Sequence, residues 1–215
     1  HLAQPKVLYA CSASSSVRKT NRVIATQPER VLDAPSLTDD VYGNLVDWAQ
    51  SGDQQIVVVG LGFEVYLFYP TTNDIVTVAS FDDANELNKV TSVKWNAEGK
   101  YIAVGTLDGT IRLFDPERRV NNQCKELRKM TAARVSKATA LSWNFAVLSV
   151  GHRSGQIMHH DVRVAEHNIG CFDGHNNMEV CDMAWSADGA YLASGGSDNI
   201  VNVWKNVDIQ TTNAQ

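Results

Sequence analysis

The chain has 215 residues, 44% of them hydrophobic and 20% charged, with a formal net charge of −5. This is the composition of a globular protein with enough apolar side chains to build a core, and the acidic balance argues against nucleic acid as a partner. No apolar run approaches the roughly 18 residues that a membrane helix needs, so we expect no membrane partner either.

Residues 1–27 are serine-rich in part and show no sustained hydrophobic period, which predicts an irregular lead-in. A repeat array is expected over residues 28–205. Residues 206–215 are expected to be a polar tail or the start of a further connection.

Short apolar segments follow one another along the array in four groups, expected at about residues 42–80, 88–128, 137–173 and 174–212. Alternating or fully apolar runs of this length predict β-strands. The expected strands are 44–48, 56–60, 65–68 and 75–79; 90–95, 101–105, 110–114 and 124–127; 139–143, 146–150, 156–160 and 168–172; and 180–185, 191–195 and 200–204. In the second group, Asp108-Gly109 supplies the positive-φ residues of a tight hairpin.

Two series of residues recur in phase along these strands. The first series closes the first strand of each group at intervals of 47, 48 and 42 residues, and consists of Trp48, Trp95, Trp143 and Trp185. The second closes the third strand at intervals of 46, 46 and 44 residues, and consists of Phe68, Phe114, His160 and Trp204. A period just above forty is typical of the tryptophan-aspartate repeat, whose unit is a four-stranded blade. The sequence therefore predicts an all-β fold, a WD40 β-propeller with about four blades.

The last group carries a histidine, serine, aspartate and tryptophan in the order of the hydrogen-bonded tetrad that stabilises such blades: His175, Ser194, Asp198 and Trp204. Buried polar groups need partners, so a structural role is expected. The alternative is a catalytic Ser/His/Asp set, but no G-x-S-x-G turn accompanies it. We expect no catalytic residue and no enzyme activity.

Metal and cofactor sites receive no support from spacing. His159 and His160 are adjacent and would point to opposite faces of a strand, and His152, His167 and Cys171 lack zinc-finger spacing. The cysteines Cys11, Cys124, Cys171 and Cys181 share no C-x-x-C spacing, which favours reduced thiols in the nucleus and cytoplasm. The first residue, His1, is not methionine, so a piece of a longer polypeptide is expected.

Four strings in order along the chain resemble the Fizzy family, the cell-division-cycle coactivators of the anaphase-promoting complex, and more closely its mitotic branch: Pro28–Pro35, Asn44–Trp48, His159–His167 and Leu192–Asn199. The resemblance implies a seven-bladed propeller, of which four blades are expected here. It also implies a substrate-recognition coactivator that binds degron peptides while a ubiquitin ligase performs the chemistry.

The same resemblance implies the binding residues. Asp47 corresponds to the aspartate of the Lys-Glu-Asn pocket, and Asp40 to the carboxylate that meets the arginine of a destruction box. The family's N-D-N turn reads Ser197-Asp198-Asn199 here, so one asparagine is replaced by serine. Arg134, in a basic cluster with Lys125, Arg128 and Lys129, is a candidate contact for an acidic peptide; the alternative is solvated surface charge.

The implied partners are subunits of the anaphase-promoting complex, degron-bearing substrates such as cyclins and securin-like proteins, and spindle-checkpoint proteins. A rival interpretation is a truncated WD40 scaffold or decoy that has lost degron capture.

Overall fold

The computed structural model describes residues 25–37, 39–49, 55–131 and 136–206, and the chain divides into two compact units, His1–Asp33 and Ala34–Gln215. The described part of the first unit, residues 25–33, contains neither helix nor strand. Most of the expected lead-in, Cys11, Arg134 and the expected tail from residue 207 lie outside the described residues.

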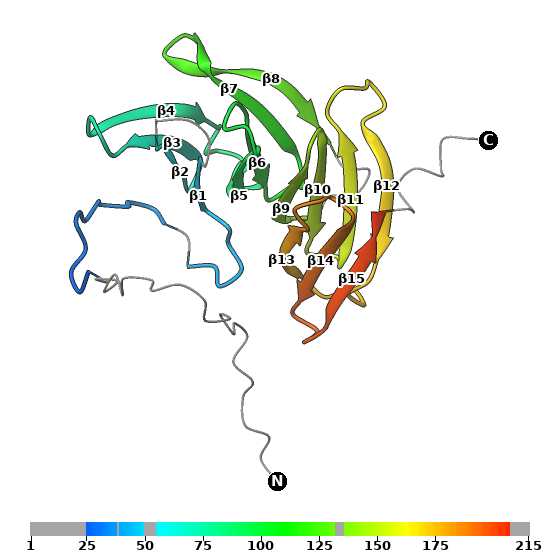
Figure 1. The fold of residues 1–215 in the computed structure, drawn as a ribbon. Coiled ribbons are helices and arrows are strands. Elements are labelled where there is room, and N and C mark those ends of the chain that lie inside the picture. Colours follow the sequence, from blue (N-terminus) through cyan, green and yellow to red (C-terminus); the bar gives the residue numbers. More distant parts are fainter. Residues whose placement is uncertain (1–24, 38, 50–54, 132–135, 207–215) are drawn as a thin grey trace, which may run out of the picture. The chain divides into compact units, whose positions relative to one another are not determined.

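The second unit is built from four antiparallel sheets, each made of strands that follow one another in the sequence (Figure 1). The first sheet contains β1 (Val46–Trp48), β2 (Val57–Leu61), β3 (Glu64–Tyr69) and β4 (Asp74–Ser80). The second contains β5 (Val90–Trp95), β6 (Ile102–Thr106), β7 (Ile111–Val120) and β8 (Gln123–Met130). The third contains β9 (Ala138–Asn144), β10 (Val147–His152), β11 (Gln156–Asp161) and β12 (Asn168–Asp173). The fourth contains β13 (Val180–Trp185), β14 (Tyr191–Gly196) and β15 (Val201–Lys205).

The predicted all-β fold with four blades is confirmed. Three sheets have four strands and the fourth, within the described residues, has three. A 3-10 turn, η1 (Glu86–Asn88), lies between the first two sheets. No helix in the described part of the chain is long and apolar enough to cross a membrane.

The first strand of each blade lies beside the first strand of the next. β1 contacts β5, β5 contacts β9 and β9 contacts β13, and the bridge between Asn44 and Ser92 is parallel. These four inner strands therefore begin at the same edge of the blades. The turns between the second and third strands lie at this edge too, because neighbouring strands are antiparallel. We call this edge the entry rim.

The hydrophobic core is divided into clusters that lie between successive blades. One cluster joins Val58 and Leu67 of the first blade to Trp95 and Ile102 of the second, and two similar clusters join the second blade to the third and the third to the fourth. Fully burying a side chain of this size contributes about 1.5–3 kcal/mol relative to leaving it exposed. Each blade is therefore stabilised mainly by its neighbours, as in other repeat proteins.

A glycine in each second strand marks where the next blade packs. A Cβ built on Gly60, Gly105 or Gly151 would lie 2.7, 2.9 or 2.7 Å from a side-chain atom of Val90, Ala138 or Val180, respectively. Each of these contacted residues is the first residue of the first strand of the next blade. The equivalent residue of the fourth blade is Gly195, and no atom of the described residues lies within 4 Å of such a Cβ there. Only glycine leaves room for this close approach between sheets.

The hairpin of the second blade is longer than predicted. The expected strands 110–114 and 124–127 extend to Val120 and begin at Gln123, and the turn between them consists of Asn121 and Asn122. Both asparagines have positive φ, 51° and 63°, which is the backbone conformation of a tight two-residue hairpin. Asparagine tolerates this conformation better than most residues, so the Asn-Asn pair was the missed signal.

Candidate functional site

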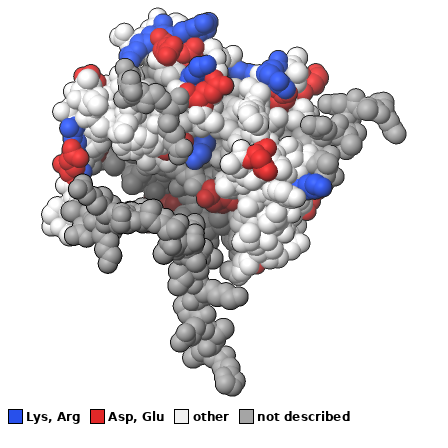
Figure 2. Space-filling view, viewed as in Figure 1, with Lys and Arg blue, Asp and Glu red and all other residues white. Residues whose placement is uncertain are grey.

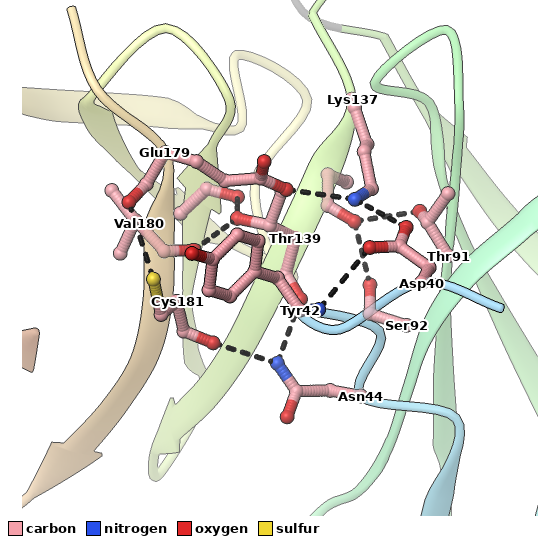
Figure 3. A network of polar contacts seen from close by, with 12 residues as sticks. Asp40, Tyr42, Asn44, Thr91, Ser92, Lys137, Thr139, Glu179, Val180 and Cys181 are labelled. Carbon is pink, nitrogen blue, oxygen red and sulfur yellow. Dashed lines mark hydrogen bonds and ion pairs between the residues drawn. The ribbon is translucent and has the colours of Figure 1, made fainter. Parts of the chain in front are cut away.

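Three charged side chains from distant segments meet at the entry rim (Figure 3). Lys137 Nζ lies 2.6 Å from Asp40 Oδ2 and 2.7 Å from Glu179 Oε1. Asp40 precedes β1, Lys137 precedes β9 and Glu179 precedes β13, so the group links three of the four blades. We call these three residues the rim triad; its formal charge is −1.

Lys137 is the most buried member of the rim triad. Its side chain is 7% exposed, whereas those of Glu179 and Asp40 are 13% and 26% exposed. A buried ammonium is costly unless paired, and the two carboxylates provide that pairing. Asp40 is therefore the member that solvent or a ligand reaches most easily.

The pKa values of Asp40 and Lys137 reflect this pairing. Burial by itself would raise the pKa of Asp40, but hydrogen bonds from Lys137 and from the Tyr42 amide outweigh burial and lower it. Burial by itself would lower the pKa of Lys137, and the two carboxylates raise it instead. Asp40 and Lys137 are thus charged at neutral pH.

Asn44 ties the segment before β1 to the third and fourth blades. Its amide Nδ2 donates to the backbone carbonyls of Thr139 at 2.9 Å and Cys181 at 3.0 Å (Figure 3). Nearby, the hydroxyls of Thr91 and Ser92 donate to the carbonyl of Ala138. These bonds hold the inner strands in fixed positions, so the rim triad sits on a rigid frame.

The Ser197-Asp198-Asn199 turn, between β14 and β15, adjoins the rim triad. The Ser197 amide donates to the Glu179 carbonyl at 2.8 Å, and Asn199 adopts a positive φ of 62°. The structure thus brings Asp40 and this turn together through Lys137 and Glu179.

Asp198 belongs to a buried network within the fourth blade. His175 Nδ1 lies 3.1 Å from Asp198 Oδ1, its Nε2 lies 2.8 Å from Ser194 Oγ, and Trp204 Nε1 donates to the same oxygen at 2.9 Å. His175 and Ser194 are almost completely buried. A substrate would not reach the Ser194 hydroxyl, so the role of the four residues is structural: their hydrogen bonds hold the strands of the fourth blade together.

The third blade carries a histidine on its second strand, next to the place where the fourth blade holds His175. A Cβ on Gly196 would lie 2.3 Å from His175 Nδ1, and the residue that stands in the place of Gly196 in the third blade is His152. His152 is buried, and its Nδ1 donates to the Ser136 carbonyl at 2.9 Å. In the third blade, His152 therefore occupies the strand position that Gly196 occupies beside His175 in the fourth.

Asp47 lies farther along β1 and is engaged by the second blade. Its carboxylate pairs with Lys94 Nζ at 2.9 Å and accepts the Trp95 amide at 2.8 Å. The side chain is 16% exposed. Asp47 therefore links two inner strands, and its carboxylate already has a cationic partner.

The remaining candidate residues have mainly structural contacts. His159 Nδ1 lies 2.8 Å from Ser149 Oγ, whereas His160 Nδ1 lies 2.8 Å from His167 Nδ1. In the described part of the chain, no group of three or more His, Cys, Asp or Glu residues is arranged to hold a metal. Of the basic cluster, Arg128 donates to the carbonyls of Val162 and Ala165, and Arg134 lies outside the described residues.

Charged side chains of both signs are visible on the face shown in Figure 2. On the face shown in Figure 2, lysine and arginine side chains lie among acidic ones and form no continuous basic area.

Sequence reasoning missed Lys137 and Glu179, although a signal was present. In every blade, the residue six positions before the tryptophan that ends the first strand is polar. These residues are Tyr42, Lys89, Lys137 and Glu179. Two opposite charges in this series, combined with the meeting of the inner strands at one rim, point to an ion pair.

Comparisons with known proteins cover most of the chain. Residues 166–205 match the model described as "WD domain, G-beta repeat", and residues 46–144 match "Anaphase-promoting complex subunit 4 WD40 domain". The first match begins in the hairpin before β12, so the sequence repeat is offset by one strand from the blade.

Three curated relatives are similar over about nine tenths of the chain. "Anaphase-promoting complex subunit cdc20" of Dictyostelium discoideum is 40% identical over 92% of this chain and 37% of its own length. "WD repeat-containing protein slp1" of Schizosaccharomyces pombe is 43% identical over 87% of this chain and 36% of its own. "Protein FIZZY-RELATED 3" of Arabidopsis thaliana is 39% identical over 91% and 38%. The chain therefore spans well under half the length of these relatives.

A solved structure has the same fold. A chain in "Crystal Structure of Mitotic Checkpoint Complex" superposes with a TM-score of 0.76 and 39% identity, covering 95% of this chain and 59% of that one.

Proposed function

Because the chain belongs to the Fizzy family of WD40-repeat proteins, we propose that it contributes the degron-reading surface of a coactivator of the anaphase-promoting complex. The proposed partners are subunits of that complex, destruction-box and Lys-Glu-Asn peptides of substrates such as cyclins and securin-like proteins, and spindle-checkpoint proteins. The proposed location is the nucleus and cytoplasm.

The observation that supports this proposal is the position of Asp40 in the rim triad. Asp40 is the most exposed member of a group with net charge −1, and it adjoins the Ser197-Asp198-Asn199 turn through Glu179. A carboxylate in this setting suits the guanidinium or ammonium group of a peptide. The mechanism is binding and proximity, with the ubiquitin ligase performing the chemistry.

A scaffold or decoy without degron capture is the second candidate, and a specific observation favours it. Asp40 and Asp47 already pair with Lys137 and Lys94, so an incoming cation meets carboxylates that are partly neutralised. Ser197 also has a shorter reach than the asparagine of the family's turn, which removes about one hydrogen bond, a loss of about 1 kcal/mol.

Binding of fluorescent Lys-Glu-Asn and destruction-box peptides distinguishes the two candidates. Saturable binding that Asp40→Ala or Asp47→Ala weakens, while Asp83→Ala on the exposed connection before η1 does not, supports degron capture. A folded sample that binds neither peptide supports the scaffold.

A further inference from the structure

We propose that Glu179 is a positioning residue for cation capture at Asp40, because it keeps Lys137 from neutralising that carboxylate. The inference rests on the proposed function and extends it to a residue that does not need to touch the ligand. The ligand group is a peptide guanidinium or ammonium.

The ammonium group of Lys137 is shared between two carboxylates. Its ammonium lies at almost equal distances from the two carboxylates, 2.6 Å from Asp40 and 2.7 Å from Glu179. One positive charge is thus shared between two negative ones. Without the charge of Glu179, the same ammonium would pair with Asp40 alone and the group would be neutral.

Asp40 is more accessible to a ligand than Glu179. The side chain of Glu179 is 13% exposed and that of Asp40 is 26% exposed, so a ligand reaches Asp40 first. Asp40 Oδ2 accepts from Lys137 and Oδ1 accepts from the Tyr42 amide. A carboxylate has about four acceptor positions, so it still has room for a guanidinium donor.

The surroundings of the rim triad do not remove its excess charge. Arg153 also acts on Asp40 and lowers its pKa, but its side chain is exposed, where water and salt screen it. The Ser197 amide donates to the Glu179 carbonyl, which fixes the backbone of Glu179 beside the turn. Glu179 is therefore held where its charge acts on Lys137.

The test compares proteins that differ in the charge of the rim triad. The wild type carries −1, Glu179→Gln carries 0, and Lys137→Met combined with Glu179→Gln carries −1 again. The probe is a short peptide with one arginine, and its control is the same peptide with neutral citrulline in place of arginine. Affinities are measured by NMR titration, which detects millimolar binding, and folding is checked by the urea midpoint of each protein.

We expect Glu179→Gln to weaken binding of the arginine peptide by about fivefold, which corresponds to about 1 kcal/mol, the interaction of two unit charges about 4 Å apart in water. The double variant should regain wild-type affinity, and the citrulline peptide should be unaffected throughout. Wild-type affinity in Glu179→Gln, or an equally weak double variant, would overturn the inference. A wild type that does not distinguish arginine from citrulline would overturn the proposed cation capture itself, and the inference with it.

Discussion

The packing of successive blades can be tested by adding one methyl group at matched positions. Gly151 and Gly195 occupy the same place in the second strand of the third and fourth blades, and neither has positive φ, so alanine is compatible with both backbones. A Cβ on Gly151 would lie 2.7 Å from Val180 Cγ1 and 2.9 Å from its Cβ, whereas a Cβ on Gly195 meets nothing within 4 Å.

The expected effects have opposite signs. Gly151→Ala forces two sheets apart, and overpacking of this kind typically costs about 1–3 kcal/mol. Gly195→Ala meets no neighbour and restricts the unfolded chain, which typically stabilises by about 0.4–1 kcal/mol. The two variants should therefore differ in unfolding free energy by about 1.5–4 kcal/mol, from the same two principles.

Urea unfolding followed by circular dichroism measures this difference, and Gly60→Ala serves as a second test because its Cβ would lie 2.7 Å from Val90. If Gly151→Ala and Gly195→Ala have the same urea midpoint, the third and fourth blades do not approach each other closely at Gly151.

Three further predictions concern stability. Burial lowers the pKa of His159 to about 4 and that of His160 to about 3, so both side chains are neutral in the folded protein at neutral pH. In the unfolded chain these histidines bind protons as the pH falls below about 6.5, which stabilises the unfolded state relative to the folded state. The free energy of unfolding should therefore fall by about 2 kcal/mol at pH 5 from His159 alone. Urea midpoints that do not change between pH 7.5 and pH 5 would contradict this. Ser194→Ala leaves His175 Nε2 and Trp204 Nε1 without their partner and should destabilise the fold by about 1–3 kcal/mol, measured as a lower thermal midpoint, whereas Ser186→Ala on an exposed turn should cost less. Asn122→Val places a β-branched residue at a φ of 63° and should cost about 1–3 kcal/mol, while Asn122→Gly should be tolerated; equal urea midpoints for the two would refute the turn conformation.

Repetition is what made the blades predictable. Each blade needs the same alternation of apolar residues and an aromatic side chain at the end of its first strand. Trp48, Trp95, Trp143 and Trp185 therefore recur at nearly regular intervals in the sequence. The order of His175, Ser194 and Trp204 was visible for the same reason, since their contacts lie within one blade. The Asn121-Asn122 hairpin was missed because its arms are charged and lack the alternation that marks a strand.

The sequence by itself determined the repeat, the strands of each blade and the residues that staple the fourth blade, because these depend on local patterns that recur with the period of the fold. Only the tertiary structure decided that Lys137 lies between Asp40 and Glu179, and that Asp47 pairs with Lys94. These ion pairs join different blades, and they form because the inner strands lie side by side, so that charges from different blades meet along them. No periodic pattern specifies which charges meet there, since that depends on how the sheets pack against one another.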